Sequence, residues 1–201
     1  MFDRHILPLQ KSALQPVASW LMRRGVKADQ ISISGFGLGL VSLPMTGFGY
    51  YWAGLAFIAA NRLLDGLDGA VARMTSPTDR GAFLDIALDF LFYASVPLAF
   101  AWADPAAIAL AAATLIASFV GTGSSFLAFS SIAARRGMSS GDYPQKGLYY
   151  LGGLTEGAET IGLFAAMCIW PNMFPILAFV FSALCLITTL TRWHQGWKAF
   201  S

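Results

Sequence analysis

The apolar positions of this chain form long runs that short polar segments separate. Six runs each reach roughly the 20 residues that a helix needs to cross the hydrocarbon core of a bilayer. The first run is rich in glycine, at Gly35, Gly37 and Gly39, which suits close packing between membrane helices. The predicted spans occupy residues 31–48, 50–73, 81–102, 106–134, 146–170 and 174–193.

Residues 2–24 show a different pattern. Apolar residues alternate with basic ones such as Arg4, so this segment is too charged to span a membrane. The pattern predicts an amphipathic helix that lies in the membrane interface. We expect this helix to be broken or kinked near Pro8 and Pro16 and to end at Gly25.

The composition agrees with a membrane protein. Hydrophobic residues make up 56% of the 201 residues and charged residues only 12%. A soluble protein of this size could not cover so much apolar surface with so few charges. The basic residues are scattered, which argues against nucleic-acid binding. We therefore expect an all-α, polytopic membrane protein with six transmembrane helices and an N-terminal interfacial helix, in a single domain over residues 1–201.

The basic residues divide the predicted loops into two sets. Every loop of one set contains Lys or Arg: residues 23–28, 74–80, 135–146 and 192–201. The turns of the other set contain neither: residues 48–51, 103–105 and 171–173. Because basic loops stay on the cytoplasmic side, the first set and both termini are predicted to be cytoplasmic.

Four aspartates stand out at the cytoplasmic ends of spans two and three. Asp65 and Asp68 are three residues apart, and Asp85 and Asp89 are four apart, so each pair shares one helix face. Acids on apolar helices are costly unless a positive charge sits among them. The pattern predicts a divalent metal site, with a phosphate-bearing ligand. The structural alternative is an ion-pair cluster with three arginines: Arg62, Arg73 and Arg80.

Residues 65–89 have the spacing D-x2-D-G-x2-A-R-x7-G-x3-D-x3-D. This pattern resembles the signature of the CDP-alcohol phosphatidyltransferases, integral membrane enzymes of phospholipid synthesis. The family usually has eight residues where residues 74–80 here number seven. The resemblance extends to the six-span layout, to the interfacial helix, and to Ala28, Asp29 and Ser32, which stand at the positions of a Pro-Asn-x-x-Thr motif. The whole chain resembles a branch of the family from the bacterial inner membrane.

The resemblance implies a transferase that moves a phosphatidyl or related phospho group from a CDP-linked lipid, such as CDP-diacylglycerol, to a small hydroxyl acceptor and releases CMP. It implies a homodimer and two divalent ions, Mg²⁺ or Mn²⁺, which suit oxygen ligands. The implied metal ligands are Asp65, Asp68, Asp85 and Asp89. Asp89 is also the implied general base, although spacing alone leaves Asp85 as an alternative. The expected donor-binding residues are Ser32, Gly69, Ala72, Arg73 and Gly81.

The signature covers only the donor, so the acceptor stays open. The candidate acceptor-binding residues are Arg62, Lys146, Glu156 and Glu159. Each has a structural alternative. Arg62 can pair with Asp65 one turn away, and the two glutamates, placed inside span five, can pair with a basic group. Lys146 can act only as a determinant of topology.

Two other functions are compatible with acids in a membrane protein. One is an ion- or proton-coupled transporter, but the acids cluster at one membrane end and no inverted repeat is apparent. The other is a catalytically silent family member that binds lipid, but all four acids of the signature are present. We therefore expect a CDP-alcohol phosphotransferase.

Overall fold

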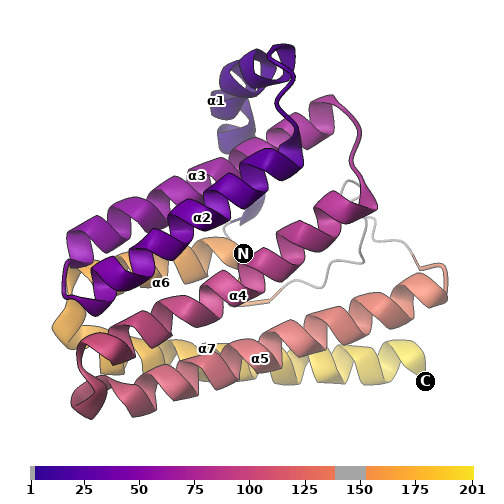
Figure 1. The fold of residues 1–201 in the computed structure, drawn as a ribbon. Coiled ribbons are helices and arrows are strands. Elements are labelled where there is room, and N and C mark those ends of the chain that lie inside the picture. Colours follow the sequence, from indigo (N-terminus) through magenta and orange to yellow (C-terminus); the bar gives the residue numbers. More distant parts are fainter. Residues whose placement is uncertain (1–2, 139–152) are drawn as a thin grey trace.

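The structure is a computed structural model that describes residues 3–138 and 153–201, with side chains from Ala13 onward. These residues are all-helical and contain no strand, which confirms the predicted fold class. Figure 1 shows the helices as a bundle. In chain order they are α1 (Asp3–Arg23), α2 (Ala28–Gly47), α3 (Tyr51–Met74), α4 (Asp79–Ala103), α5 (Pro105–Arg135), α6 (Gly157–Ile169), the 3-10 helix η1 (Pro171–Met173) and α7 (Phe174–Phe200).

Three helical segments in the described part of the chain are long and apolar enough to cross a membrane. They are α4, α5 and the segment Pro171–Phe200, which contains α7. Helices α2 and α3 have 20 and 24 residues and are not among these segments. Helix α6 has 13 residues, about 20 Å at the rise of an α-helix, which is shorter than the hydrocarbon core. The count of six spans stays a prediction.

The bundle has two groups of helices, one of α2, α3 and α4 and the other of α5 and α7, and they meet where α4 packs against α5. Helix α2 packs against α3 and α4, α4 packs against α5, and α5 packs along α7. The main core contains buried side chains from several of these helices, such as Ile58, Phe92, Leu115 and Phe164. A second, smaller core contains Ala18 and Val71 and joins α1 to the ends of α2 and α3. The packing thus makes α2, α3 and α4 a group of neighbouring helices.

Glycines let α2 and α3 approach closely. A Cβ added at Gly35 would lie 2.9 Å from the Leu64 Cβ, and one at Gly54 would lie 2.4 Å from the Thr46 hydroxyl oxygen. Both contacts are too short for real carbon atoms. Gly37 differs, because a Cβ there would meet nothing within 4 Å. Gly35 therefore has the predicted role in packing α2 against α3, whereas Gly37 has none within the described part of the chain.

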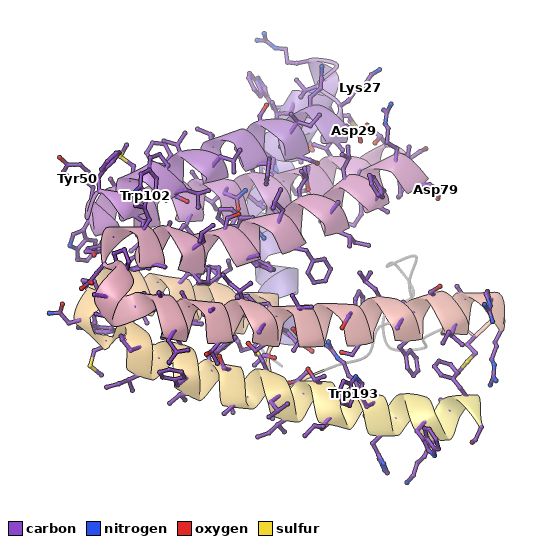
Figure 2. All side chains as sticks on the ribbon, turned by 60° about the horizontal axis from the view of Figure 1, so that its bottom comes forward. Lys27, Asp29, Tyr50, Asp79, Trp102 and Trp193 are labelled. Atoms are coloured by element: carbon purple, nitrogen blue, oxygen red, sulfur yellow. The ribbon has the colours of Figure 1, made fainter. Side chains whose placement is uncertain are left out.

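The helix ends agree with the predicted division of the loops. Figure 2 shows Lys27, Asp29 and Asp79 near one end of the bundle, and Tyr50 and Trp102 near the opposite end. The predicted basic loops before α2 and before α4 thus lie on the same side. Which side of a membrane this end faces stays a prediction.

The N-terminal segment forms one helix, so the predicted break near Pro8 and Pro16 is absent, and the alternative of a kink stays a prediction. Helix α1 runs without interruption from Asp3 to Arg23. Gly25 follows with φ of 77°, a left-handed conformation that favours glycine, so the predicted end of the helix is correct. The placement of α1 in a membrane interface stays a prediction.

The fifth predicted span differs most from the structure. Residues 153–156 are not helical, and α6 begins only at Gly157. A continuous span over residues 146–170 is therefore wrong in its described part, and the preceding residues 146–152 lie outside the described residues. The apolar run misled the prediction because hydropathy does not register a helix start that two side chains cap.

Candidate metal and donor site

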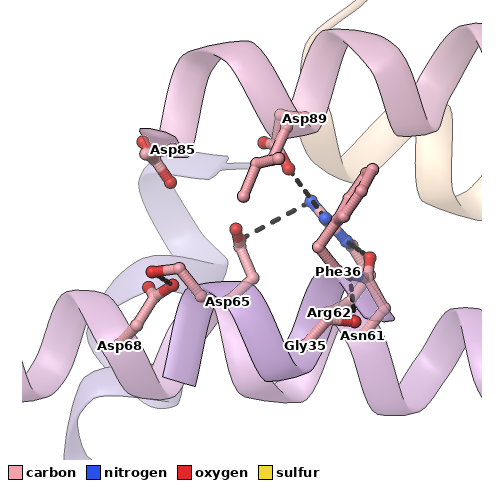
Figure 3. Close-up of a pocket in the computed structure, with 10 residues that line it drawn as sticks. Gly35, Phe36, Asn61, Arg62, Asp65, Asp68, Asp85 and Asp89 are labelled. Carbon is pink, nitrogen blue, oxygen red and sulfur yellow. Dashed lines mark hydrogen bonds and ion pairs between the residues drawn. The ribbon is translucent and has the colours of Figure 1, made fainter. Parts of the chain in front are cut away.

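The four aspartates of the signature project toward one pocket between three helices. Helix α3 carries Asp65 and Asp68, and α4 carries Asp85 and Asp89 (Figure 3). Helix α2 completes the wall, with Ser32 among its contributions. The sequence spacing keeps each pair on the inner face of its helix, and the packing of the three helices then brings the two pairs together.

Three of the aspartates form a compact group that could hold a metal ion. One carboxylate oxygen from each of Asp65, Asp68 and Asp85 lies within 4.8 Å of the other two. Oxygen ligands of Mg²⁺ or Ca²⁺ lie about 2.0–2.6 Å from the ion, so oxygens on opposite sides of it are about 4–5 Å apart. The oxygen-only set therefore fits a hard divalent cation. Asp89 does not belong to this group.

Ser32 contacts the most buried of the three carboxylates. Its hydroxyl donates a hydrogen bond to Oδ2 of Asp68, which is only 6% exposed. The same hydroxyl lies 3.2 Å from the carbonyl oxygen of Ala28. Because a hydroxyl has one proton, these two bonds are alternatives, and the charged carboxylate is the stronger acceptor. Ser32 thus fixes one wall of the pocket from α2.

Arg62 supplies the positive charge that the sequence led us to expect among the acids. Its Nη2 lies 2.7 Å from Oδ1 of Asp89, and its Nη1 lies 3.5 Å from Oδ2 of Asp65. The predicted alternative, a pair with Asp65, is therefore present, but the shorter contact is with Asp89. No acceptor is needed to explain why this arginine is in the pocket.

Two residues that sequence reasoning missed hold Arg62 in place. The Nε of Arg62 donates to the Asn61 side-chain oxygen at 2.8 Å, and its Nη1 donates to the Tyr93 hydroxyl at 3.0 Å. Helical spacing offered a signal for Tyr93, because it lies one turn after Asp89 on α4 and shares its face. Asn61 offered none, because its role depends on its contact with α2.

The predicted donor residues cluster at the end of the bundle where α3 ends and α4 begins. Gly69 lies under Arg73, since a Cβ added there would be 3.1 Å from a guanidinium nitrogen. Ala72 is half-buried on the same helix. Gly81 donates its amide to the Thr78 hydroxyl at 3.1 Å, which caps the start of α4. Of the predicted donor residues, Ser32 lines the pocket, whereas Gly69, Ala72, Arg73 and Gly81 are not among its lining residues.

An ion pair ties the start of α4 to α2. Nη2 of Arg80 lies 2.5 Å from Oδ2 of Asp29, and Nε of Arg80 donates to the same oxygen at 2.8 Å. Arg80 is largely exposed, so this pair contributes little to stability. Arg80 therefore pairs with a residue of α2. Of the three arginines in the alternative ion-pair cluster, only Arg62 pairs with the signature aspartates among the described ion pairs.

Of the predicted acceptor residues, Arg62 lines this pocket, whereas Glu156 and Glu159 do not. Glu156 and Glu159 form a capping box at the start of α6, in which each side chain accepts a backbone amide of the other. Glu156 also accepts the amide of Gly153 at 3.0 Å. Their placement inside a membrane-spanning helix was therefore wrong. Lys146 lies outside the described residues.

Arg192 was also placed incorrectly by the sequence. We counted it with a cytoplasmic loop, but it lies within α7 and is only 7% exposed. Its Nη1 donates to the carbonyl oxygen of Thr122 on α5 at 2.9 Å. This arginine therefore links α7 to α5 and is not a surface charge.

Comparison with known proteins identifies the family. Residues 26–194 match the family described as CDP-alcohol phosphatidyltransferase. The chain belongs to the CDP-alcohol phosphatidyltransferase family. Over 197 residues it is 49% identical to the inner membrane protein YnjF of Escherichia coli (strain K12), covering 98% of this chain and 96% of that protein. Over 85 residues, 42% of each chain, it is 36% identical to the archaetidylinositol phosphate synthase of Methanothermobacter thermautotrophicus.

Solved structures show the same fold. The phosphatidylinositol phosphate synthase of Mycobacterium tuberculosis with CDP-DAG bound matches with a TM-score of 0.73 at 22% identity, covering 92% of this chain and 93% of that one. The same enzyme in complex with manganese and citrate matches with a TM-score of 0.72 at 22% identity, covering 92% and 88%. This CDP-alcohol phosphatidyltransferase is thus a membrane enzyme of phospholipid biosynthesis, and family membership disfavours the transporter hypothesis.

Proposed function

We propose that this enzyme transfers a phosphatidyl or related phospho group from a CDP-linked lipid to a hydroxyl acceptor and releases CMP. The observation that carries the proposal is the convergence of four aspartates from α3 and α4, three of them within 4.8 Å. A pyrophosphate is strongly anionic and can enter such a pocket only with cations. The geometry of the three oxygens supports a divalent ion there.

The proposed metal ligands are Asp65, Asp68, Asp85 and Asp89, which would hold two divalent ions, Mg²⁺ or Mn²⁺. When bound, these ions neutralise the pyrophosphate and stabilise the charge that develops on the departing CMP. The compact group of three carboxylates supports the first ion. The position of Asp89 one turn beyond Asp85 supports its sharing the second.

Asp89 is the proposed general base. Its carboxylate takes the proton of the acceptor hydroxyl, whose oxygen bonds to the β-phosphorus while the bond from that phosphorus to the CMP oxygen breaks. Asp89 is the better choice than Asp85 because it lies outside the compact three-carboxylate group. Its location one turn farther from the loop than Asp85 also suits an acceptor that meets a lipid-bound phosphate.

The proposed donor site consists of Ser32, Gly69, Ala72, Arg73 and Gly81. The contact of Ser32 with Asp68 and the position of Arg73 over Gly69 support this assignment. The distribution of basic loops supports a cytoplasmic site, with both termini on the same side of a bacterial inner membrane. A homodimer is proposed from the family.

The acceptor is proposed to be a small hydroxyl-bearing headgroup. A polyol phosphate such as inositol phosphate is the first compound to test, because two proteins similar to this chain are named as synthases of inositol phosphate lipids. Glycerol phosphate and serine are the next, since they differ in charge and size but also offer a hydroxyl.

The test is release of CMP by the purified protein in detergent micelles that contain CDP-diacylglycerol. We expect release that needs Mn²⁺ or Mg²⁺, needs one acceptor, and stops with EDTA. An aspartate-to-asparagine change outside the pocket should leave CMP release unchanged. Asp104→Asn is such a change, because Asp104 caps α5 at the far end of α4 and asparagine caps equally well. Protein that binds CDP-diacylglycerol yet releases no CMP with any acceptor would support the silent lipid-binding hypothesis instead.

A further inference from the structure

The paired ends of α5 and α7 form a feature that the proposed chemistry does not use. The two helices pack along each other, and in Figure 1 they end side by side at the end of the bundle where α4 begins. We call residues 126–138, at the end of α5, and 190–201, at the end of α7, the paired tip. These residues include arginine and lysine but neither aspartate nor glutamate, so the tip is positively charged.

A compact set of contacts fixes the last turn of α7. The guanidinium of Arg136 donates to the carbonyl oxygens of Phe200 at 2.8 Å and of Ala199 at 3.3 Å. The Phe200 ring packs against the Phe129 ring, with 4.7 Å between the ring centres. The last carbonyls of a helix have no partner within the helix, and such ends fray. Because Arg136 binds two of these carbonyls, the last turn of α7 is held in a defined place.

An exposed stripe of α7 changes from aliphatic to aromatic as it approaches the tip. Leu186 and Leu190 are exposed. Trp193 and Trp197 continue the same face at helical spacing, and they are 61% and 83% exposed. Aliphatic side chains suit the hydrocarbon core of a bilayer, whereas tryptophan is enriched at the level of the headgroups. The stripe therefore has the pattern of a membrane-facing surface that reaches the interface at Trp193.

The length of α7 agrees with this placement. At the rise of an α-helix, Trp193 lies about 29 Å along α7 from Phe174, where the helix begins, and Lys198 lies about 36 Å along it. The hydrocarbon core of a bilayer is about 30 Å thick, and the headgroup layers extend the bilayer to about 40–45 Å. With Phe174 at one edge of the core, Trp193 lies at the opposite edge and Lys198 lies within the headgroup layer.

Two exposed cations lie at the tip beside the aromatic part of the stripe. Lys198 directly follows Trp197, and Arg135 is in the last turn of α5. The other two arginines of the tip have different roles, since Arg192 is buried and Arg136 binds the end of α7. A Lys or Arg near the membrane surface strengthens the attraction to anionic lipid by about fivefold in affinity.

We propose that the paired tip binds the headgroups of anionic phospholipids. The two tryptophans of the stripe lie in the interface, and Arg135 and Lys198 contact the lipid phosphates. Two observations favour a lipid as the occupant. The stripe continues the exposed face of a helix that is apolar enough to cross a membrane, and the charge of the tip is opposite to that of the headgroups. The inference goes beyond the proposed function, because it needs neither a metal ion nor turnover.

Thermal unfolding of the full chain tests this inference, in neutral detergent micelles titrated with dioleoylphosphatidylglycerol or with dioleoylphosphatidylcholine. A lipid that binds only the folded protein raises the unfolding temperature, and the concentration dependence gives its affinity. We expect the wild type to bind phosphatidylglycerol at least about tenfold more tightly than phosphatidylcholine, since each of two cations contributes about fivefold. The double variant Arg135→Gln, Lys198→Gln should lose at least about tenfold in affinity for phosphatidylglycerol and none for phosphatidylcholine.

The double variant Arg24→Gln, Lys27→Gln is the matched control. It removes two exposed basic residues outside the tip, before α2. It should lower the affinity for phosphatidylglycerol by less than about twofold, because these residues lie outside the proposed binding surface. Equal losses in the two double variants would overturn the inference, and so would equal affinities of the wild type for the two lipids.

A second measurement separates a lipid surface from a contact between copies of this chain. The double variant Trp193→Ser, Trp197→Ser should weaken phosphatidylglycerol binding and leave the molar mass in micelles, measured by light scattering, unchanged. A lower molar mass with an unchanged lipid preference would make the stripe an interface between copies, and the inference would fail. If a double variant did not fold, Lys198→Gln alone should lower the affinity for phosphatidylglycerol about fivefold, and an unchanged affinity would overturn the inference.

Discussion

Replacing Ser32 by alanine probes how far the pocket depends on α2. The change removes the hydroxyl that donates to Asp68 and leaves a carboxylate that is 6% exposed with one fewer partner. A hydrogen bond to a charged group contributes about 1.5–3 kcal/mol. Loss of a group that orients a metal ligand typically weakens metal binding by about 10- to 100-fold. The two magnitudes agree, because tenfold in affinity corresponds to about 1.4 kcal/mol.

The assay for Ser32→Ala is the affinity for Mn²⁺ of the site formed by Asp65, Asp68 and Asp85, with CMP release measured in parallel. We expect an affinity about 10- to 100-fold lower, and recovery of most of it in Ser32→Thr, which restores a hydroxyl. Ser42→Ala is the matched control, because Ser42 is a buried serine of the same helix that donates to the Gly39 carbonyl at 2.6 Å and does not line the pocket. Equal affinities in wild type and Ser32→Ala would refute the reasoning.

Three further predictions follow from single contacts. Asp89→Asn should lower the rate of CMP release by about 10²- to 10⁴-fold, the usual contribution of a general base, while CDP binding and the circular dichroism spectrum are retained; full activity would remove Asp89 as the base. Gly54→Ala should lower the free energy of unfolding by about 1–3 kcal/mol, because its Cβ would meet the Thr46 hydroxyl at 2.4 Å. Gly37→Ala is the control and should not destabilise the protein, so equal thermal unfolding of the two variants would contradict the packing argument. Glu156→Ala should cost about 1 kcal/mol of stability through loss of the α6 cap without changing the KM for the acceptor, and a raised KM would restore Glu156 as an acceptor ligand.

The outline of the fold could be predicted because it depends on local patterns. Apolar runs of sufficient length marked α4, α5 and α7, and their observed starts lie within two residues of the predicted ones. Glycine after a basic turn marked the end of α1 at Gly25. Such signals depend on neighbouring residues along the chain and need no knowledge of the other helices.

The errors occurred where a capping contact or a tertiary contact outweighs hydropathy. The run that contains α6 is apolar enough to suggest one continuous span, yet Glu156 and Glu159 cap a helix start within it. Arg192 looked like a loop charge, yet the Thr122 carbonyl and the packing of α5 on α7 accommodate it in a helix. No periodicity in the sequence marks the partner of Arg192, because that partner lies on a distant segment.

The aspartate stretch shows what each level contributes. The sequence by itself determined the four-aspartate signature, and with that signature the membership in the family. It also determined that Asp65 and Asp68 share one helix face and that Asp85 and Asp89 share another, because helical periodicity alone sets this. Only the tertiary structure decided that three carboxylates gather while Asp89 faces Arg62. The physical reason is that this choice depends on how α4 sits against α3, and packing contacts such as those of Asn61 with Gly35 and Gly39 set where the charges meet.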